Sequence, residues 1–147
     1  MLCREEGLAL SELVANPDKP LAGFGLFGII KETSVDDKGL FDFTGFFPYP
    51  LYKDVNLDFY MALGNRKLSL PWNPWTFIKG IFWVRRIGKR LKAKNIEGNL
   101  VGEGLTKGGV IIFGKDKRAK YAYAEETGEE LPLDDILAAV EAVKRGK

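Results

Sequence analysis

Cys3 is the residue with the clearest capacity for chemistry in this sequence. It is the single cysteine among 147 residues, and it lies in the first turn of a predicted helix. Unpaired backbone N–H groups and the positive end of the helix dipole stabilise a thiolate at such a position, and Arg4 adds a cation beside the sulfur. We therefore expect Cys3 to react with iodoacetamide faster than an unperturbed cysteine near neutral pH. The alternative is a small apolar residue that is buried for structural reasons.

The helix that positions Cys3 is predicted from residue spacing. Leu10, Leu13 and Val14 recur at helical intervals. The segment Asn16–Pro20 ends the helix, because its two prolines cannot continue helical geometry. The polar residues of the helix are expected to face solvent or a polar rim: Glu5, Glu6, Ser11 and Glu12.

Composition excludes several kinds of site. One cysteine excludes an internal disulfide and a multi-cysteine zinc site, and the absence of histidine excludes a Ser-His-Asp triad, a Cys-His pair and a histidine-based metal centre. We expect no metal and no cofactor. The hydrophobic share of 46% and the charged share of 29% are typical of a soluble globular protein, so residues 1–147 are predicted to form a single domain. No apolar run is long enough to span a bilayer and no signal peptide is visible. We therefore expect a reducing, cytoplasmic environment, unless a preceding targeting segment directs the protein to an organelle.

The rest of the chain alternates between predicted strands and helices. The segment Leu21–Lys31 is apolar at both odd and even positions, which is typical of a strand covered on both faces of a parallel sheet. Val110–Phe113 and Ala119–Ala124 are predicted to form a hairpin, and Leu133–Val143 is the clearest helix. The shorter predicted elements are a helix at Leu40–Phe47, a strand at Leu51–Asn56 and a helix at Leu57–Leu63.

Basic residues crowd the segment from Arg66 to Lys94, which holds nine of them and no acidic residue. Apolar residues at helical spacing between Trp75 and Leu91 predict a basic amphipathic helix, within the range 75–94. Three interpretations remain: a helix packed on the protein's own sheet, which we prefer, a helix on a membrane surface, or a phosphate-binding or nucleic-acid surface. The net charge of +2 is too small to imply a nucleic-acid partner. The residues that would serve a membrane surface are Lys79, Arg85, Arg86, Lys89 and Arg90.

Two blocks of this sequence resemble a known family. The first is Cys3–Glu6 with the leucine-spaced helix that follows, and the second is the glycine-rich stretch Asn95–Gly104 followed by Gly108–Phe113. Both are similar to segments of the peroxiredoxin-like 2 family, thioredoxin-fold proteins of the alkyl hydroperoxide reductase and thiol-specific antioxidant group that include selenoprotein U and the prostamide/prostaglandin F synthases. The resemblance extends from Cys3 to about Val143 and is weaker between Val35 and Trp75.

The resemblance implies an α/β fold with a thioredoxin-like sheet and flanking helices. It also implies a Cys-x-x-Cys or selenocysteine-x-x-Cys motif in which Cys3 is the second member, so that the first would stand immediately before Met1. We therefore expect a domain that is incomplete at its N-terminus and lacks the strand leading into the motif. One hypothesis is that a selenocysteine codon was interpreted as a stop and translation was assigned to Met1; an engineered or misassigned truncation is the alternative.

The function implied by the resemblance is that of a thiol- or selenol-dependent antioxidant oxidoreductase. Its substrates would be peroxides or a prostaglandin-type endoperoxide, and its reductant a thiol such as thioredoxin or glutathione. Cys3 would resolve the oxidised intermediate by forming an S–S or Se–S bond, with Arg4 supporting thiolate character. Gly108 and Gly109 stand where the wider thioredoxin superfamily has a cis-proline, and are expected to line the wall opposite Cys3. The alternative function is a non-enzymatic membrane-surface protein that uses the basic helix.

Overall fold

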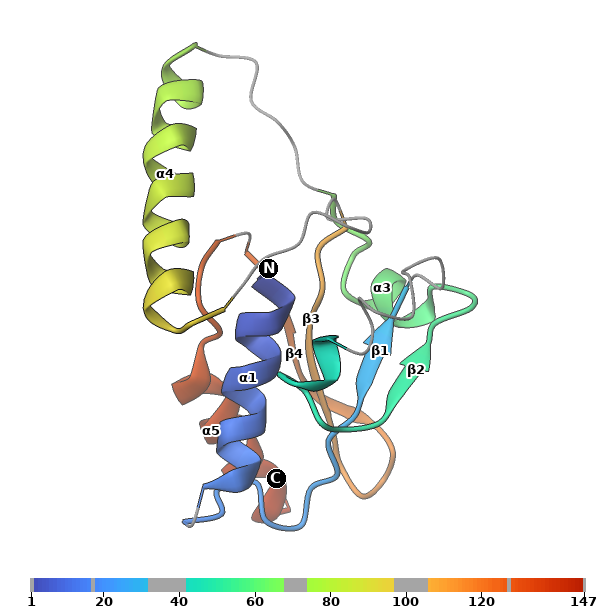
Figure 1. The fold of residues 1–147 in the computed structure, drawn as a ribbon. Helices are drawn as coiled ribbons and strands as arrows, with labels where there is room; N and C mark the ends of the chain where they lie inside the picture. The colour runs from blue at the N-terminus through green and yellow to red at the C-terminus, as the bar shows by residue number, and fades with distance from the viewer. Residues whose placement is uncertain are drawn as a thin grey trace.

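The computed structural model describes residues 2–16, 18–31, 42–67, 74–96, 106–126 and 128–146, without the side chains of Leu2 and of residues 74–79. Helices and short strands alternate along the chain (Figure 1). In order, they are α1 (Leu2–Ala15), β1 (Gly28–Ile30), β2 (Leu51–Lys53), α3 (Asp58–Ala62), α4 (Pro74–Ala93), β3 (Gly109–Phe113), β4 (Ala119–Ala124) and α5 (Leu133–Lys144). None of the described helices is both long enough and apolar enough to cross a membrane.

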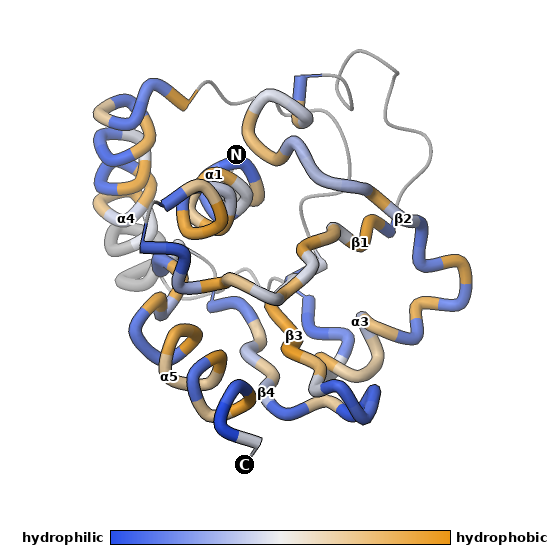
Figure 2. The backbone as a smooth tube through the Cα atoms, turned by 90° about the horizontal axis from the view of Figure 1, so that it is seen from below, coloured by the Kyte–Doolittle hydropathy of each residue, from blue (hydrophilic) through white to orange (hydrophobic). Residues whose placement is uncertain are grey.

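Helix α1 lies between α4 on one side and the strands and α5 on the other (Figure 2). Its leucine-spaced side faces the larger core, in which Ile136 and Val140 of α5 are each only 2% exposed. The α1 residues that contact this core are Leu10, Leu13 and Val14, as their spacing predicts. Burying such side chains is the main source of stability in a small domain, so the C-terminal half of α1 is fixed by α5 and the β3–β4 hairpin.

A second, smaller core joins α1 to α4. Ile87 and Leu91 of α4 are buried there together with Ile96, and Leu8 of α1 and Phe46 pack against them. The basic amphipathic helix predicted over 75–94 is therefore confirmed as a helix, beginning at Pro74. Its partner is α1 rather than the sheet we expected.

The described strands form two separate two-stranded sheets. β1 pairs with β2 in parallel, and β3 pairs with β4 in antiparallel register. The predicted hairpin, the strand at β2, and the helices at α3 and α5 are confirmed. The chain thus combines helices with small sheets in the α/β arrangement of a thioredoxin-like fold.

The strand predicted over Leu21–Lys31 is wrong in its length, because only Gly28–Ile30 is extended and paired. The residues before it form turns: the N–H of Ala22 donates to the carbonyl of Lys19, and Gly23 has a φ of 87°. Such a left-handed backbone suits glycine and cannot belong to a strand. The apolar run therefore contributes side chains to the core, including Leu21, without forming a long strand.

Substituting Ile136 by alanine should lower the free energy of unfolding by about 2 to 5 kcal/mol, because it opens a cavity in the larger core. Ile81→Ala is the matched control: it removes the same atoms from a side chain that is 46% exposed, and should change stability by less than about 1 kcal/mol. Equilibrium urea unfolding of both variants measures the difference. Equal losses in the two variants would contradict the position of this core.

Candidate functional site

Cys3 lies on the first turn of α1 and is exposed, so the structure does not support the alternative of a buried structural cysteine. The part of the β3–β4 hairpin that lies near Cys3 is its open end. There, Gly108 precedes β3 and Glu125 follows β4. These two residues bind each other twice: the N–H of Gly108 donates to Oε2 of Glu125, and the N–H of Glu125 donates to the carbonyl of Gly108, both at 2.9 Å. The Glu125 carboxylate is buried in this position.

The pKa of the Cys3 thiol is raised above its ordinary value, which is the opposite of the expected direction. Desolvation by the surrounding protein is the largest cause, followed by the negative charges of Glu6 and Glu125. Although the residue is exposed, desolvation and the carboxylates near the thiol disfavour its ionisation. Desolvation, together with these acidic neighbours, outweighs the helix terminus that was expected to favour a thiolate.

Glu6 has the most strongly shifted carboxyl group of this site. Desolvation, then the charges of Glu125 and Glu5, raise its pKa from 4.5 to about 8. A raised carboxyl pKa means that the folded protein holds this proton more tightly than the unfolded chain does. Glu6 is therefore largely protonated at neutral pH, and its contribution to stability, complete below about pH 4.5, is lost as the pH rises to about 8.

Arg4 does not stand free beside the sulfur. It is buried, and its guanidinium carbon lies 5.2 Å from the centre of the Phe46 ring, in cation–π geometry. Gly109, in turn, is needed for a close approach of backbones, because a Cβ atom there would overlap the carbonyl of Tyr123 on β4. Gly108 is the more open of the two glycines: a Cβ there would lie 3.6 Å from Oε2 of Glu125.

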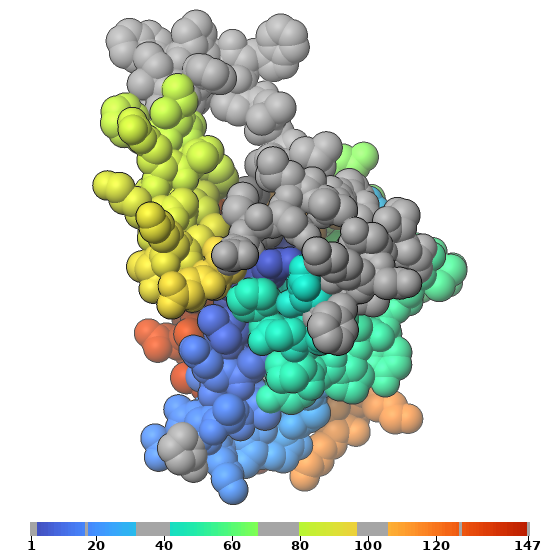
Figure 3. Space-filling model, viewed as in Figure 1, coloured from blue at the N-terminus to red at the C-terminus, as the bar shows by residue number. Residues whose placement is uncertain are grey.

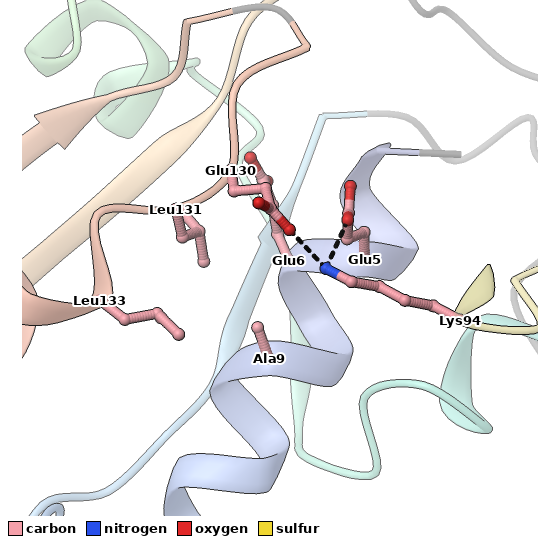
Figure 4. A pocket seen from close by; sticks show the side chains of 7 residues that line it. All are labelled: Glu5, Glu6, Ala9, Lys94, Glu130, Leu131 and Leu133. Atoms are coloured by element: carbon pink, nitrogen blue, oxygen red, sulfur yellow. Dashed lines mark hydrogen bonds and ion pairs between the residues drawn. The ribbon is translucent and has the colours of Figure 1, made fainter. Parts of the chain in front are cut away.

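Glu5 was expected to face solvent or a polar rim, whereas the structure buries it: it is 5% exposed. Its carboxylate accepts a hydrogen bond of 2.9 Å from Arg90 and one of 2.7 Å from Lys94, both provided by α4 and the turn after it. Lys94 also donates to Glu130 at 2.6 Å (Figure 4). Desolvation lowers the pKa of Lys94, but the hydrogen bonds to Glu130 and Glu5 outweigh it and raise the pKa. Ser11 is likewise buried, where its hydroxyl donates to the carbonyl groups of Gly7 and Phe46.

A cavity of about 30 Å³ lies beside this ion-pair network. It is lined by Glu5, Glu6, Ala9, Lys94, Glu130, Leu131 and Leu133 (Figure 4). Such a volume holds about one water molecule, so it cannot admit an organic substrate. Within the described ranges, moreover, no group of three or more Asp, Glu, Cys or His residues could hold a metal ion.

Two functional candidates, Glu6 and Glu125, escaped the sequence-based reasoning. Glu6 was placed on the polar side of the helix, and Glu125 drew no attention at the end of a strand. The only available signal was the pair Glu5–Glu6, which is separated from Cys3 by Arg4. Whether such carboxylates approach a thiol depends on how α1 packs against the hairpin, which residue spacing within α1 does not determine.

Replacing Glu6 by glutamine should speed alkylation of Cys3 at about pH 9 by between about twofold and tenfold, because it removes a negative charge that opposes thiolate formation. The rate of iodoacetamide labelling, followed by mass spectrometry from neutral to alkaline pH, measures the effect. Glu12→Gln, on the exposed side of the same helix, is the control and should leave the rate unchanged. An unchanged rate in the Glu6 variant would contradict the electrostatic coupling.

Comparison with known proteins adds the family to this geometry. The family model described as AhpC/TSA antioxidant enzyme matches residues 9–127. The prostamide/prostaglandin F synthase of Salmo salar is 32% identical, with 95% of this chain and 68% of the relative covered, and that of Bos taurus is 33% identical with the same coverage. Peroxiredoxin-like 2A of Gallus gallus is 31% identical, with 97% of this chain and 60% of the relative covered. No solved structure gives a significant match. The chain belongs to the peroxiredoxin-like 2 family of AhpC/TSA-type proteins.

Proposed function

We propose that Cys3 is the resolving thiol of an antioxidant oxidoreductase that reduces peroxides or a prostaglandin-type endoperoxide. Family membership supports a redox function. The observation that carries the finer assignment is the exposed thiol on the first turn of α1, beside Glu125 at the open end of the hairpin. In the motif that the family suggests, its partner is a Cys or selenocysteine immediately before Met1.

The raised pKa of Cys3 fits the second step of the reaction better than the first. The first step needs a nucleophile that is ionised at neutral pH, because only the thiolate or selenolate attacks a peroxide oxygen efficiently. A thiol that keeps its proton reacts slowly with dilute peroxide. It can still attack an oxidised partner three positions away, because the two groups are held at high effective concentration.

The proposed reaction balances in two steps. In the first, the partner's thiolate or selenolate attacks one peroxide oxygen, the O–O bond breaks, and the departing alkoxide or hydroxide takes a proton to become an alcohol or water. In the second, Cys3 loses its proton and attacks the oxidised sulfur or selenium, forming an S–S or Se–S bond and releasing the second oxygen as alcohol or water. An external dithiol or thiol, such as thioredoxin or glutathione, then reduces that bond.

The neighbouring residues have distinct parts in this proposal. Glu125 accepts a hydrogen bond from the N–H of Gly108, and Gly109 allows β3 to approach β4 closely. We propose that Gly108 and Gly109 form the substrate-side wall opposite Cys3. Arg4 contributes a fixed positive charge near the first turn of α1. The thiol reductant places this chemistry in a reducing compartment, and the cytoplasm is our proposal.

A variant with one cysteine added directly before Met1 tests the assignment. With dithiothreitol as reductant, it should consume hydrogen peroxide at least about tenfold faster than the same chain with serine added there, because only the cysteine supplies the primary nucleophile. Stoichiometric peroxide without reductant should form a disulfide to Cys3, seen as the loss of two hydrogens in the intact mass and as a linked peptide pair.

The matched control carries Cys3→Ser in addition to the added cysteine. Its first step should survive, and the sulfenic acid should accumulate and be trapped by dimedone, while the intramolecular disulfide disappears. If the variant with the added cysteine consumes peroxide no faster than the serine control, or if removing Cys3 changes neither disulfide nor dimedone labelling, Cys3 is not the resolving thiol.

A further inference from the structure

Helix α4 carries an apolar patch that no described residue covers. Phe82 is 67% exposed and Ile81 is 46% exposed, although both occur in the middle of a 20-residue helix. The C-terminal half of α4 packs on α1 through Ile87 and Leu91. Its N-terminal half extends beyond the body of the protein, and the described part forms a ridge in the space-filling view (Figures 1 and 3).

Four of the basic residues of α4 divide into two groups. Arg86 donates to Glu129 at 3.2 Å, and Arg90 donates to the buried carboxylate of Glu5, so both are engaged within the protein. Arg85 and Lys89 are exposed, and among the described residues neither has an ion-pair partner. No acidic residue occurs anywhere in α4. Not all the basic residues of α4 therefore present an uncompensated positive charge to solvent, because Arg86 and Arg90 are paired within the protein.

Helical spacing places the exposed apolar and basic residues on one face. Phe82, Arg85 and Lys89 are related by i, i+3 and i+7, and Ile81 is one turn before Arg85. This face points away from the buried residues Ile87 and Leu91. The outer face of α4 thus combines large apolar side chains and uncompensated cations on one side of the helix. Helices that lie in the interface of an anionic bilayer have this composition.

We propose that the outer face of α4 docks on an anionic lipid surface. Phe82 and Ile81 enter the boundary between headgroups and acyl chains, and Arg85 and Lys89 contact the phosphate and carboxylate groups of the lipids. A helix of 20 residues is about 30 Å long and lies parallel to the surface, with the rest of the protein on the aqueous side. The proposal is independent of Cys3 and of the redox assignment.

Co-sedimentation with vesicles tests this surface. The full chain should pellet with vesicles of phosphatidylcholine containing about 30% phosphatidylserine, stay in solution with pure phosphatidylcholine, and dissociate as salt is raised, because screening weakens the attraction. Neutralising both cations in Arg85→Gln/Lys89→Gln should weaken partitioning by about 30-fold, since each cation strengthens binding to an anionic surface roughly fivefold. Phe82→Ser should weaken it by at least about tenfold through the loss of apolar insertion.

The matched control is Lys115→Gln/Arg118→Gln, in the exposed turn between β3 and β4. It removes two positive charges, as the α4 variant does, and takes the formal net charge from +2 to 0 in both cases. It should leave binding within about twofold of the wild type, which separates a local surface from an effect of net charge. Circular dichroism melts establish that each variant is folded, and Cys3→Ser should bind as the wild type does.

Three results would overturn the proposal. The first is recovery of the wild-type chain in the supernatant with anionic vesicles at low salt. The second is an equal loss of binding in the two charge-neutralised variants. The third is a lipid-independent dimer, detected by light scattering, that Phe82→Ser dissociates: the apolar patch would then be a contact between two copies of the chain.

Discussion

The arrangement of the helices depends on the ion pairs that the buried carboxylate of Glu5 makes. This carboxylate lies at the first turn of α1 and binds Arg90 and Lys94, two cations that belong to α4 and its C-terminal turn. A carboxylate in such a place needs its partners, since breaking a buried ion pair by removing one of its members costs about 3 to 5 kcal/mol. Together with Leu91 in the smaller core, this network determines where α4 stands, and therefore which face of α4 is left outside.

The same turn of α1 sets the chemistry of the thiol. Glu5 is neutralised by cations, whereas Glu6 is close to Glu125 and keeps its proton at neutral pH. Three carboxyl groups within a short distance cannot all ionise freely in a partly desolvated region. The result is a thiol with a raised pKa that stays protonated at neutral pH, which suits closing a disulfide with a neighbour better than attacking a dilute oxidant.

Elements with local signals were predictable from the sequence. The helices α1 and α5 and the β3–β4 hairpin follow from periodicity and turn residues within each segment. The environment of Glu5 was not predictable, because its partner Lys94 is 89 residues away. The length of β1 was missed for another reason: apolar residues at both odd and even positions predict a strand buried on both faces, but Ala22 and Gly23 lie in an exposed turn, and Gly23 has the left-handed backbone geometry that suits glycine. Cys3 could be named from the motif, but the direction of its pKa shift could not, since that depends on desolvation by the folded protein and on the charges of Glu6 and of the distant residue Glu125.

The position of α1 also has a consequence for synthesis on the ribosome. This helix precedes in the chain the described residues that pack against it, and the contacts that close the larger core come from α5, near residue 140. A helix of 14 residues is marginal in water without tertiary partners, and long-range contacts form only when both segments are available. During translation, Cys3 therefore spends most of its time on a segment that has not yet folded, away from Glu125. The nascent thiol ionises more readily than the mature one, so the chain is most vulnerable to alkylation and oxidation before its last helix emerges.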